Sequence, residues 1–271
     1  MKTLDKNITA IPQWDESAQE IWDNKFKALT ENSETVAASD IPLEQNRWKR
    51  ISLYIASAVA VLLIVFSATA FLYTKDINTA RGKMIEISLP DGSVAQLSAG
   101  TSISYKPLLW WVRPSATLSG QAYFSGNHAK GLTIETQQGQ IKVLGTTFVV
   151  NTLNTKLLVA CLQGKVEFRN GTASALLTDN MQTVVDNGKI ETTKIVDKES
   201  IVGWTKGIFS YDNKPLDEVV KDIERYYNIN VESPAGIDTL RYSGRFTNDK
   251  APQEVLSILG RPYGLTFNIK K

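Results

Sequence analysis

The sequence predicts a membrane-anchored, multi-domain protein in which helical segments come first and β-structure follows. Three observations predict this fold class. Residues Ile51–Tyr73 form an uncharged apolar run, residues 82–197 alternate apolar and polar side chains, and residues 204–271 mix strand and helix periodicities. We therefore expect an α-helical arm over residues 1–50, one transmembrane helix over 51–73, an all-β domain, rolled or sandwich-like, over 82–197, and a small α+β domain over 204–271.

The apolar run has 23 residues. At about 1.5 Å per residue, such a helix can cross the roughly 30 Å hydrocarbon core of a bilayer. Buried core helices are usually shorter and polar on one side, and the apolar part of a cleaved signal peptide is about 7–15 residues long and lies near the chain start. The polar side chains in the run are small hydroxyls that can bond back to the helix: Ser52, Ser57, Ser67 and Thr69. A membrane span fits better than either alternative.

The flanking charges predict an orientation. Arg47, Lys49 and Arg50 directly precede the run, whereas Lys75 and Asp76 after it nearly cancel. The positive-inside bias places the N-terminus in the cytoplasm and the bulk of the chain on the other side of the cell inner membrane.

The N-terminal arm contains an amphipathic helical pattern from Pro12 to Leu29. Its apolar face consists of Trp14, Ala18, Ile21, Trp22, Phe26 and Leu29. Residues 1–46 carry four Lys and nine Asp or Glu, a net charge of about −5. A helix lying on a membrane surface prefers a basic polar face, so we expect this helix to fill a groove on a protein partner.

The chain lacks the residue patterns of an enzyme. With only Cys161 and His128, it can form neither an intramolecular disulfide nor a Cys/His zinc cluster. No GxSxG elbow, HExxH motif, Walker loop or GxGxxG occurs. Residues 74–271 carry 23 basic and 19 acidic side chains, about +4, and neither this value nor that of the arm gives a basic nucleic-acid footprint. We predict no enzymatic activity, no cofactor and no direct nucleic-acid binding, with Cys161 as a buried structural thiol.

Beyond the membrane run, alternating segments predict strands around residues 85–89, 132–136 and 165–168, separated by Gly-containing turns. Residues 74–80 read as a short linker. The tail is predicted to have a βαβ–βαβ arrangement, with two helices on one face of a small sheet. The predicted elements are, in order, strand 207–211, helix 216–227, strand 229–232, strand 242–246, helix 252–260 and strand 265–269. Residues 198–203 are the expected domain boundary.

Four blocks in the β region resemble the FecR family. They are Leu89-Pro90-Asp91-Gly92-Ser93-Val94 with the following 97–105, then 118–124, 143–151 and 164–166. Each block also has a physical reason. Asp91-Gly92 suits a tight turn, Gly120 and Gly145 suit bends or close approaches, and Tyr123, Phe124 and Phe148 suit a core. The motif residues that we expect to be structural are Leu89, Pro90, Asp91, Gly92, Gly120, Tyr123, Phe124, Gly145, Thr146 and Phe148.

The tail resembles the domain that often follows FecR and is similar to the short N-terminal module of secretins and TonB-dependent transporters, the STN module. The resemblance is carried by Trp204, Gly207, Phe209, Leu216, Val219, Tyr226-Tyr227, Gly244, Phe246, Val255, Leu256, Leu259, Tyr263-Gly264-Leu265 and Phe267.

The resemblance implies an inner-membrane anti-sigma factor. Its cytoplasmic arm would bind an extracytoplasmic-function (ECF) sigma factor, here through Trp14, Ile21, Trp22, Phe26 and Leu29. Its periplasmic part would receive a signal from the STN domain of a TonB-dependent outer-membrane transporter. Sigma activity would change, commonly through intramembrane or nearby proteolysis, and control genes for iron or glycan uptake. A rigid push through the linker 74–80 has no visible coupling element. The alternatives are a structural envelope or secretion scaffold with an STN-like domain, and a membrane-anchored hydrolase.

Overall fold

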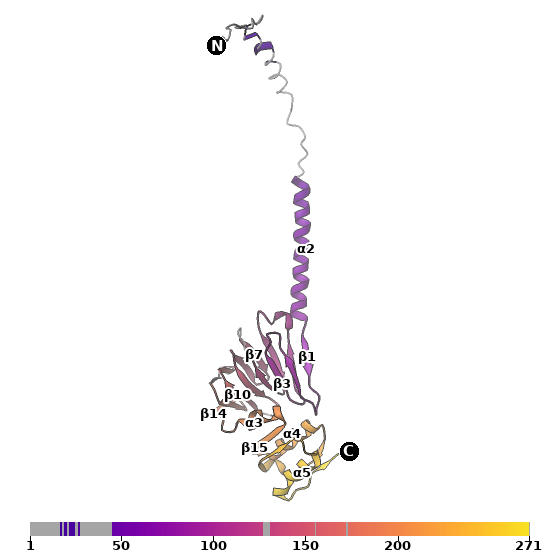
Figure 1. The fold of residues 1–271 in the computed structure, drawn as a ribbon, viewed down its shortest axis with the longest axis vertical. Coiled ribbons are helices and arrows are strands. Elements are labelled where there is room, and N and C mark those ends of the chain that lie inside the picture. The colour runs from indigo at the N-terminus through magenta and orange to yellow at the C-terminus, as the bar shows by residue number, and fades with distance from the viewer. Residues whose placement is uncertain are drawn as a thin grey trace, which may run out of the picture. The chain divides into compact units, whose positions relative to one another are not determined.

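The structure is a computed structural model that describes residues 17, 19–20, 22–24, 27, 45–126, 131–154, 156–171 and 173–270. It divides into two compact units, residues 1–63 and 64–271. The second unit contains the end of the long helix α2 and all of the β-structure (Figure 1).

Helix α2 spans Gln45–Leu72, so it begins six residues before the apolar run. Its segment Ile51–Leu72 has a mean hydropathy of 2.5 and is long and apolar enough to cross a membrane. Three hydroxyls inside it, on Ser57, Ser67 and Thr69, donate to backbone carbonyls three residues earlier at 2.8, 3.0 and 2.8 Å. These groups therefore need no partner outside the helix, as the lipid environment of a membrane span requires.

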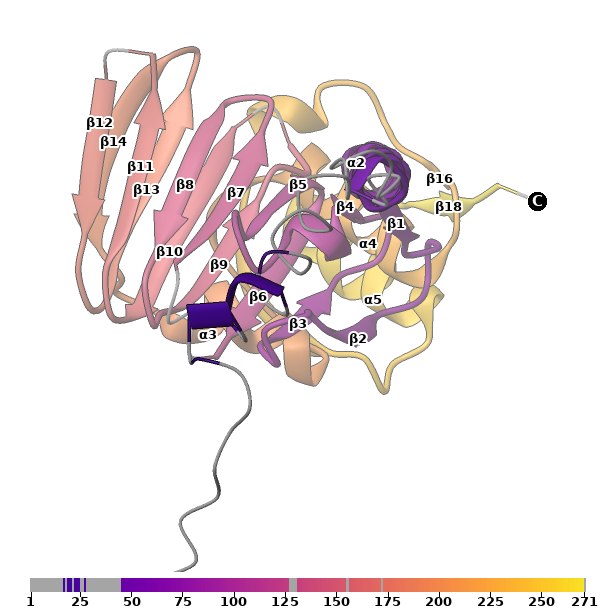
Figure 2. The ribbon, with the colours of Figure 1, turned by 90° about the horizontal axis from the view of Figure 1, so that it is seen from above.

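Two seven-stranded sheets pack face to face and form a β-sandwich (Figure 2). The first sheet has the order β1 (Lys75–Asn78), β4 (Ser102–Tyr105), β5 (Ser115–Ser119), β7 (Leu132–Thr136), β8 (Gly139–Val143), β11 (Val166–Asn170), β12 (Ala173–Leu177). The second has the order β14 (Lys189–Lys194), β13 (Met181–Asp186), β10 (Leu157–Gln163), β9 (Thr147–Asn151), β6 (Gln121–Ser125), β3 (Val94–Leu97), β2 (Ile85–Ser88). This is the sandwich form of the expected all-β domain.

Hairpins alternate between the two sheets along the chain. Strand β6 crosses to the second sheet, so β5 and β7 become parallel neighbours, whereas the other pairs are antiparallel. Alternate side chains point into one shared core, where the rings of Phe124 and Phe148 stack with centroids 4.8 Å apart. The period-two pattern in the sequence thus corresponds to this inward-facing set.

The segment expected to be a linker, residues 74–80, contains strand β1. Lys75 pairs with Tyr105 and Asn78 with Ser102 in an antiparallel ladder with β4. Only Ile77 of this strand packs against the sandwich core. The expectation of a linker is therefore wrong: the β-domain begins at Lys75, because pairing with a neighbouring strand orders a segment that has little alternation of its own.

The expected boundary at residues 198–203 is also ordered. Helix α3 (Lys198–Val202) continues into the 3-10 helix η2 (Gly203–Lys206), and the Asp197 carboxylate caps α3 by accepting from the Glu199 N–H at 2.9 Å. Ile201 packs with Val149 and Ala160 on the outer face of the second sheet. This helix fastens the chain to the sandwich before the C-terminal region begins.

The C-terminal region has the expected order of elements. They are β15 (Ile208–Pro215), α4 (Leu216–Tyr227), β16 (Val231–Glu232), η3 (Ile237–Thr239), β17 (Arg241–Thr247), α5 (Pro252–Gly260), η4 (Arg261–Tyr263) and β18 (Asn268–Ile269). The expectation of one small sheet is wrong. Strand β15 pairs with β17, and β16 pairs with β18, in two separate two-stranded ladders. Most of the buried residues in the core of this region come from the apolar faces of helices α4 and α5.

Candidate functional site

Ser17 and Glu20 form a helix cap in the arm. The Ser17 backbone N–H donates to the Glu20 carboxylate at 3.0 Å, and the Glu20 N–H donates to Ser17 Oγ at 3.3 Å, which is a capping box. The hydrogen bonds from Ser17 lower the pKa of Glu20. The described residues from 19 to 27 are helical. Ser17 thus satisfies a free N–H of the first turn, and Pro12, where the predicted helical pattern begins, lies outside the described residues.

Trp22 lies on this helix and is 61% exposed. The other predicted sigma-binding residues, Trp14, Ile21, Phe26 and Leu29, lie outside the described residues. An exposed tryptophan on a short amphipathic helix offers a large apolar surface for burial in a complex.

The end of α2 leads almost directly into the sandwich. Only Tyr73 and Thr74 separate α2 from β1, and the Tyr73 N–H still donates to the Thr69 carbonyl at 2.8 Å. Ala70 in the last turn of the helix is buried. A displacement or rotation of this helix end therefore acts on the β1–β4 ladder without an intervening flexible segment.

Arg81 joins the sandwich to the C-terminal region. It follows β1, and its guanidinium donates to the backbone carbonyls of Glu224 at 3.0 Å and Ile229 at 2.8 Å. The guanidinium also reaches Asn230 Oδ1 at 3.3 Å, and the next residue, Gly82, donates its N–H to the Arg225 carbonyl at 2.9 Å. A cation at the end of α4 interacts favourably with the helix dipole and with the last helical carbonyls. Sequence reasoning missed this contact because its partners lie more than 140 positions away.

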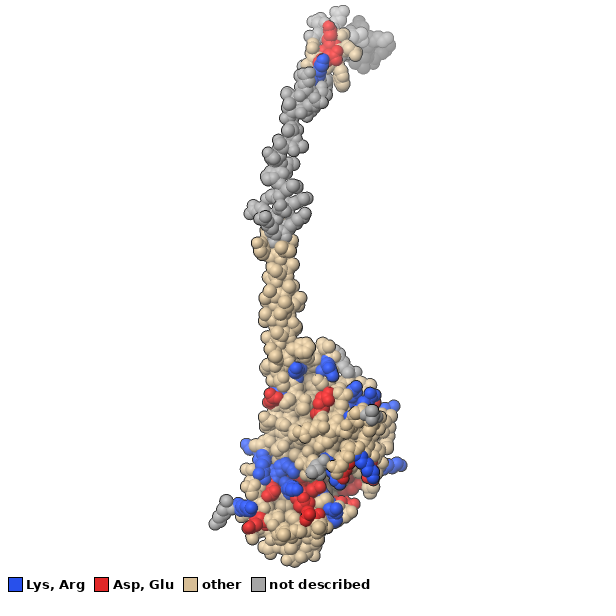
Figure 3. All heavy atoms as spheres, turned by 180° about the vertical axis from the view of Figure 1, so that it is seen from behind, with Lys and Arg blue, Asp and Glu red and all other residues tan. Residues whose placement is uncertain are grey.

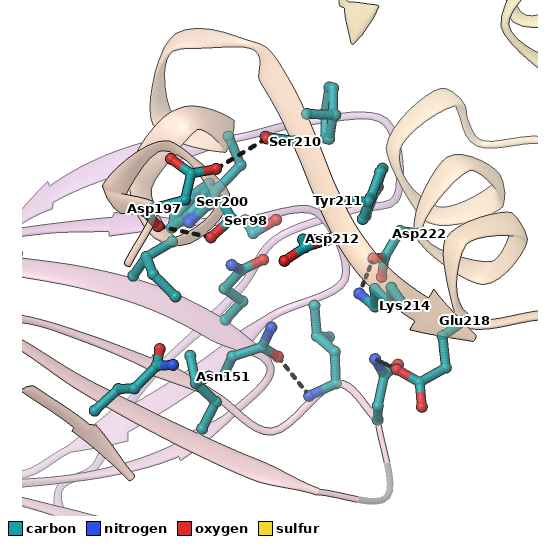
Figure 4. Close-up of a pocket in the computed structure, with 18 of the residues that line it drawn as sticks. Ser98, Asn151, Asp197, Ser200, Ser210, Tyr211, Asp212, Lys214, Glu218 and Asp222 are labelled. Carbon is teal, nitrogen blue, oxygen red and sulfur yellow. Dashed lines mark hydrogen bonds and ion pairs between the residues drawn. The ribbon is translucent and has the colours of Figure 1, made fainter. Parts of the chain in front are cut away.

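A cleft of about 620 Å³ lies between the outer face of the second sheet and the C-terminal region (Figure 4). One wall comes from β9, β10, β13 and β14, and the other from α3, β15 and α4. Asn154 bridges the two walls by donating to the Glu218 carboxylate at 2.8 Å. On the α3 side, Ser210 of β15 donates to Asp197 at 3.1 Å. Two residues of the lining, Trp204 and Gln182, each have a buried polar atom, Nε1 and Oε1, without a hydrogen-bond partner in the described structure.

An ion network lines the C-terminal wall of the cleft. The Asp222 carboxylate lies 2.5 Å from Lys214 Nζ and 3.1 Å from Arg225 Nη1, and Lys214 Nζ lies 5.2 Å from the centroid of the Tyr211 ring. Burial, followed by the nearby Asp222 charge, raises the pKa of Tyr211 well above its usual value. The charges are thus paired across α4 and β15, which fixes the geometry of this wall.

The predicted family-motif residues hold turns and the core. The Gly92 N–H donates to the Leu89 carbonyl at 2.9 Å, and Asp91 accepts from the Ser93 N–H at 3.0 Å, which closes the turn between β2 and β3. Thr146 is buried and donates to the Lys165 carbonyl at 2.9 Å. Pro90 lies within the same β2–β3 turn, and Gly145 takes a positive φ of 60° between β8 and β9.

Tyr123 does not lie in the core that Phe124 and Phe148 share. It packs on the outer face of the second sheet with the cluster around Ile201. Successive residues of a strand point to opposite faces, so Tyr123 and Phe124 cannot enter the same core. The expectation that all three rings fill one core is wrong for Tyr123.

The backbone at Gly120 passes very close to Thr101. Its φ is +124°, and an added Cβ would lie 2.6 Å from the Thr101 Cα. The Gly120 N–H donates to Thr152 Oγ1 at 2.7 Å. This position therefore excludes larger residues for reasons of packing.

Cys161 is buried, as expected, and its thiol donates to the Gly164 carbonyl at 3.5 Å. Burial, and secondarily the Asp179 charge, raises its pKa to about 11. Within the described ranges, no cluster of three or more His, Cys, Asp or Glu could hold a metal ion. His128 lies outside those ranges.

Two family models match the chain. The model described as FecR protein matches residues 75–167, and the model described as FecR, C-terminal, matches residues 208–271. Together they cover more than half of the sequence. The comparison with curated proteins gave no match.

Solved structures give the same picture. Two crystal structures of a candidate anti-sigma factor from Parabacteroides distasonis ATCC 8503, at 2.50 and 1.65 Å resolution, superpose with TM-scores of 0.65 and 0.66. Their sequences are 25% and 26% identical to that of this chain. Each match covers 73% of this chain, and 99% and 95% of the respective solved chain.

The fold and the described contacts define a class of protein with one candidate membrane span, a β-sandwich that follows it directly, and an α+β region attached to the sandwich. The chain belongs to the FecR family and carries the C-terminal FecR domain. This is a family of membrane-associated, non-enzymatic anti-sigma factors, which agrees with the prediction that the chain is not an enzyme and implies a sigma factor as partner.

Proposed function

We propose that the protein is a single-pass inner-membrane anti-sigma factor that binds an ECF sigma factor in the cytoplasm. Its periplasmic part receives a signal from the STN domain of a TonB-dependent outer-membrane transporter, and the outcome is control of genes for iron or glycan uptake. In this proposal residues 1–50 are the sigma-binding arm, 51–73 the span, 75–197 the sandwich and 204–271 the STN-like receiver.

The membrane topology follows from α2 and its flanks. The segment Ile51–Leu72 has a mean hydropathy of 2.5, and Ala70 is its one buried residue, so its other apolar side chains lack protein cover. A lipid bilayer supplies that cover. Arg47, Lys49 and Arg50 at its start favour a cytoplasmic N-terminus. A reporter fused after Gly82 should be active only as a periplasmic enzyme, and cytoplasmic activity would refute the orientation.

The arm supplies the sigma-binding surface. Trp22 is exposed on a capped helix, and the acidic charge of residues 1–46 complements the basic surfaces with which a sigma factor meets DNA. Burial of Trp22 and its neighbours in a groove would supply most of the binding energy, and the acidic side chains would favour encounter with the partner.

The C-terminal region supplies the receiving surface. Its strands form two-stranded ladders, and the outer edge of β17, Arg241–Thr247, is a candidate for pairing with a strand of the transporter's STN domain. This region is tied to the sandwich by Arg81 and Asn154.

The direct connection between α2 and β1 is the observation that carries transmission across the membrane. Docking at the C-terminal region would shift α4, and Arg81 would pass the shift to the segment after β1. The two residues between β1 and α2 would then pass it to the helix, which presents its flank for cleavage or changes the arm. In this proposal a mechanical shift of the helix comes first, and proteolysis at its flank can follow.

Co-purification of the full-length protein with its ECF sigma factor tests the cytoplasmic half. We expect Trp22→Ala to reduce the recovered sigma factor at least tenfold, because a buried tryptophan is a typical hot spot of about 2 kcal/mol or more. Asn24→Ala is the matched control, because residue 24 is exposed and side chains two positions apart on a helix point to nearly opposite sides. Its binding should be unchanged.

Deletion of residues 1–46 separates this proposal from the structural scaffold. A regulator without its arm loses control of sigma activity, whereas an envelope scaffold keeps its role. Unchanged transcription after the deletion, or equal sigma binding by the Trp22→Ala and Asn24→Ala proteins, would refute the anti-sigma assignment.

A further inference from the structure

We propose that the loop Lys106–Arg113, between β4 and β5, inserts into the bilayer that α2 crosses, from the side on which the β-sandwich lies. The inference rests on the membrane span of the proposed function. It adds a second membrane contact, made by the sandwich itself with lipid.

The strand register brings this loop to the end of α2. Lys75, the first residue of β1, pairs with Tyr105, the last residue of β4. Because the strands are antiparallel, β4 runs back toward the helix and its continuation leaves the sheet beside the chain's exit from α2. The side chains agree: Lys106 Nζ lies 5.6 Å from the ring centroid of Phe71 in the last turn of α2.

Backbone hydrogen bonds give the loop a defined turn structure. Pro107 starts a 3-10 turn, and the Val112 and Arg113 N–H groups donate to the Leu109 carbonyl at 3.0 and 2.9 Å. Trp110 anchors the loop, since it is buried in the sandwich core and meets the Tyr105 ring edge-on at 5.4 Å.

The anchored loop presents apolar side chains outward. Leu108 is 45%, Trp111 58% and Val112 84% exposed. The other large apolar side chains exposed on the described part of 75–270 are isolated from one another in the sequence: Met84, Leu144, Leu176 and Val196. A cluster of three within five residues is the kind of exposed patch that marks an interaction surface, whereas single exposed side chains are ordinary.

The chemistry of the loop fits a lipid surface. Trp is favoured at the headgroup level of membranes because its ring is apolar and its N–H is polar. Lys106 and Arg113 flank the apolar side chains, and cations at this depth attract anionic headgroups. Figure 3 shows Lys or Arg side chains on the sandwich next to the end of α2. A protein partner would have to approach this patch beside the helix, in space that the bilayer itself occupies.

Depth measurements on the full-length protein test the proposal. A nitroxide label is attached to Val112→Cys in vesicles of phosphatidylethanolamine and phosphatidylglycerol, and its collisions with oxygen and with a water-soluble nickel complex are compared. Val196→Cys is the matched control, since both are exposed valines and Val196 lies by the cleft, between β14 and α3. The buried native Cys161 leaves the labelling selective.

We expect the label at position 112 to be shielded from nickel and accessible to oxygen, and the label at position 196 to behave as in water. A third label at Ala60, within α2, reports the span. If position 60 is shielded and position 112 is as open to nickel as position 196, the loop proposal is refuted and the span stands. If position 60 is open, the proposed topology and the loop proposal both fail.

Discussion

The β-sandwich and the C-terminal region both enclose apolar cores, but the two cores are closed in different ways. In the sandwich, two continuous seven-stranded sheets face each other over a single cluster of 23 buried residues. In the C-terminal region, two helices and two short ladders enclose 12. The larger core is closed by long-range backbone pairing, whereas the smaller one depends on helix packing.

The difference indicates which part can move. The sandwich shares its hydrogen bonds across whole sheets, so a local shift disturbs many neighbours. The C-terminal region is fixed to it through a few polar contacts around Arg81, Asn154 and Ser210, and through α3. A signal that repositions the C-terminal region therefore costs less than one that deforms the sandwich.

The largest expected effect comes from emptying the sandwich core. Phe148→Ala removes one ring of the stacked Phe124–Phe148 pair and should lower the free energy of unfolding by about 3–5 kcal/mol. Phe267→Ala empties the smaller core and should reduce protection only in the C-terminal region. Urea denaturation and amide hydrogen exchange on residues 74–271 measure both.

Leu176→Ala is the control for these core variants, since Leu176 is 63% exposed, and its effect should stay within about 0.5 kcal/mol. If Phe267→Ala destabilised the strands of the sandwich as much as Phe148→Ala, the two regions would form one cooperative unit and the comparison would fail.

A smaller loss of folding stability is expected where Gly120 closely approaches Thr101. Gly120→Ala places a Cβ 2.6 Å from the Thr101 backbone and should cost about 1–3 kcal/mol. Gly188→Ala is the matched control, because Gly188 also has a positive φ but nothing within 4 Å of the added Cβ. Thermal unfolding compares the two. Equal losses would mean that backbone conformation rather than the close approach sets the cost.

Loss of the Arg81 contacts should cost about 1–3 kcal/mol, confined to the attachment of the C-terminal region. In Arg81→Ala, the amides at the end of α4 should exchange faster, while the sandwich core keeps its protection. Lys83→Ala, two residues away on the same exposed segment, should leave exchange unchanged. Faster exchange throughout the sandwich would show that Arg81 supports the whole fold.

The smallest effect is the response to alkaline pH. Burial raises the pKa of the Cys161 thiol from its ordinary 9.0 to about 11. The folded state then holds this proton more tightly than the unfolded state, so its contribution to stability is complete below pH 9 and is lost as the pH rises through about 11. At pH 8, Cys161 should react with a disulfide reagent far more slowly in the folded protein than in urea.

Tyrosines should make the C-terminal region the more alkali-sensitive of the two. Burial raises the pKa of Tyr211, Tyr227 and Tyr242 above the ordinary 10.0, and so their contributions are also lost with rising pH. Hydrogen exchange near pH 10 should open this region before the sandwich. The reverse order would contradict the idea that the C-terminal region is the weaker part.

The elements with strong periodicity could be predicted from the sequence. The bounds of α4 and α5 agree with prediction, because their apolar residues recur at helical spacing. The sandwich strands followed from period-two alternation and from Gly-containing turns.

The parts that could not be predicted depend on distant partners. Strand β1 has one apolar residue, Ile77, and becomes a strand only through its ladder with β4. Helix α3 is five residues long, too short for a helical period, although Asp197 at its start is a recognisable cap. The pairing of β15 with β17 could not be predicted because alternation shows which face of a strand is buried and does not show which strand lies beside it.

The sequence by itself determined the candidate span, the β-character of the middle, the two helices of the tail and the family. These depend on local patterns of apolarity and on short motifs, which are properties of neighbouring residues. The tertiary structure alone decided that α2 runs directly into the sandwich, that Arg81 holds the end of α4, and that Lys106 lies beside Phe71. Those facts depend on contacts between residues far apart in the chain, which only the folded backbone brings together.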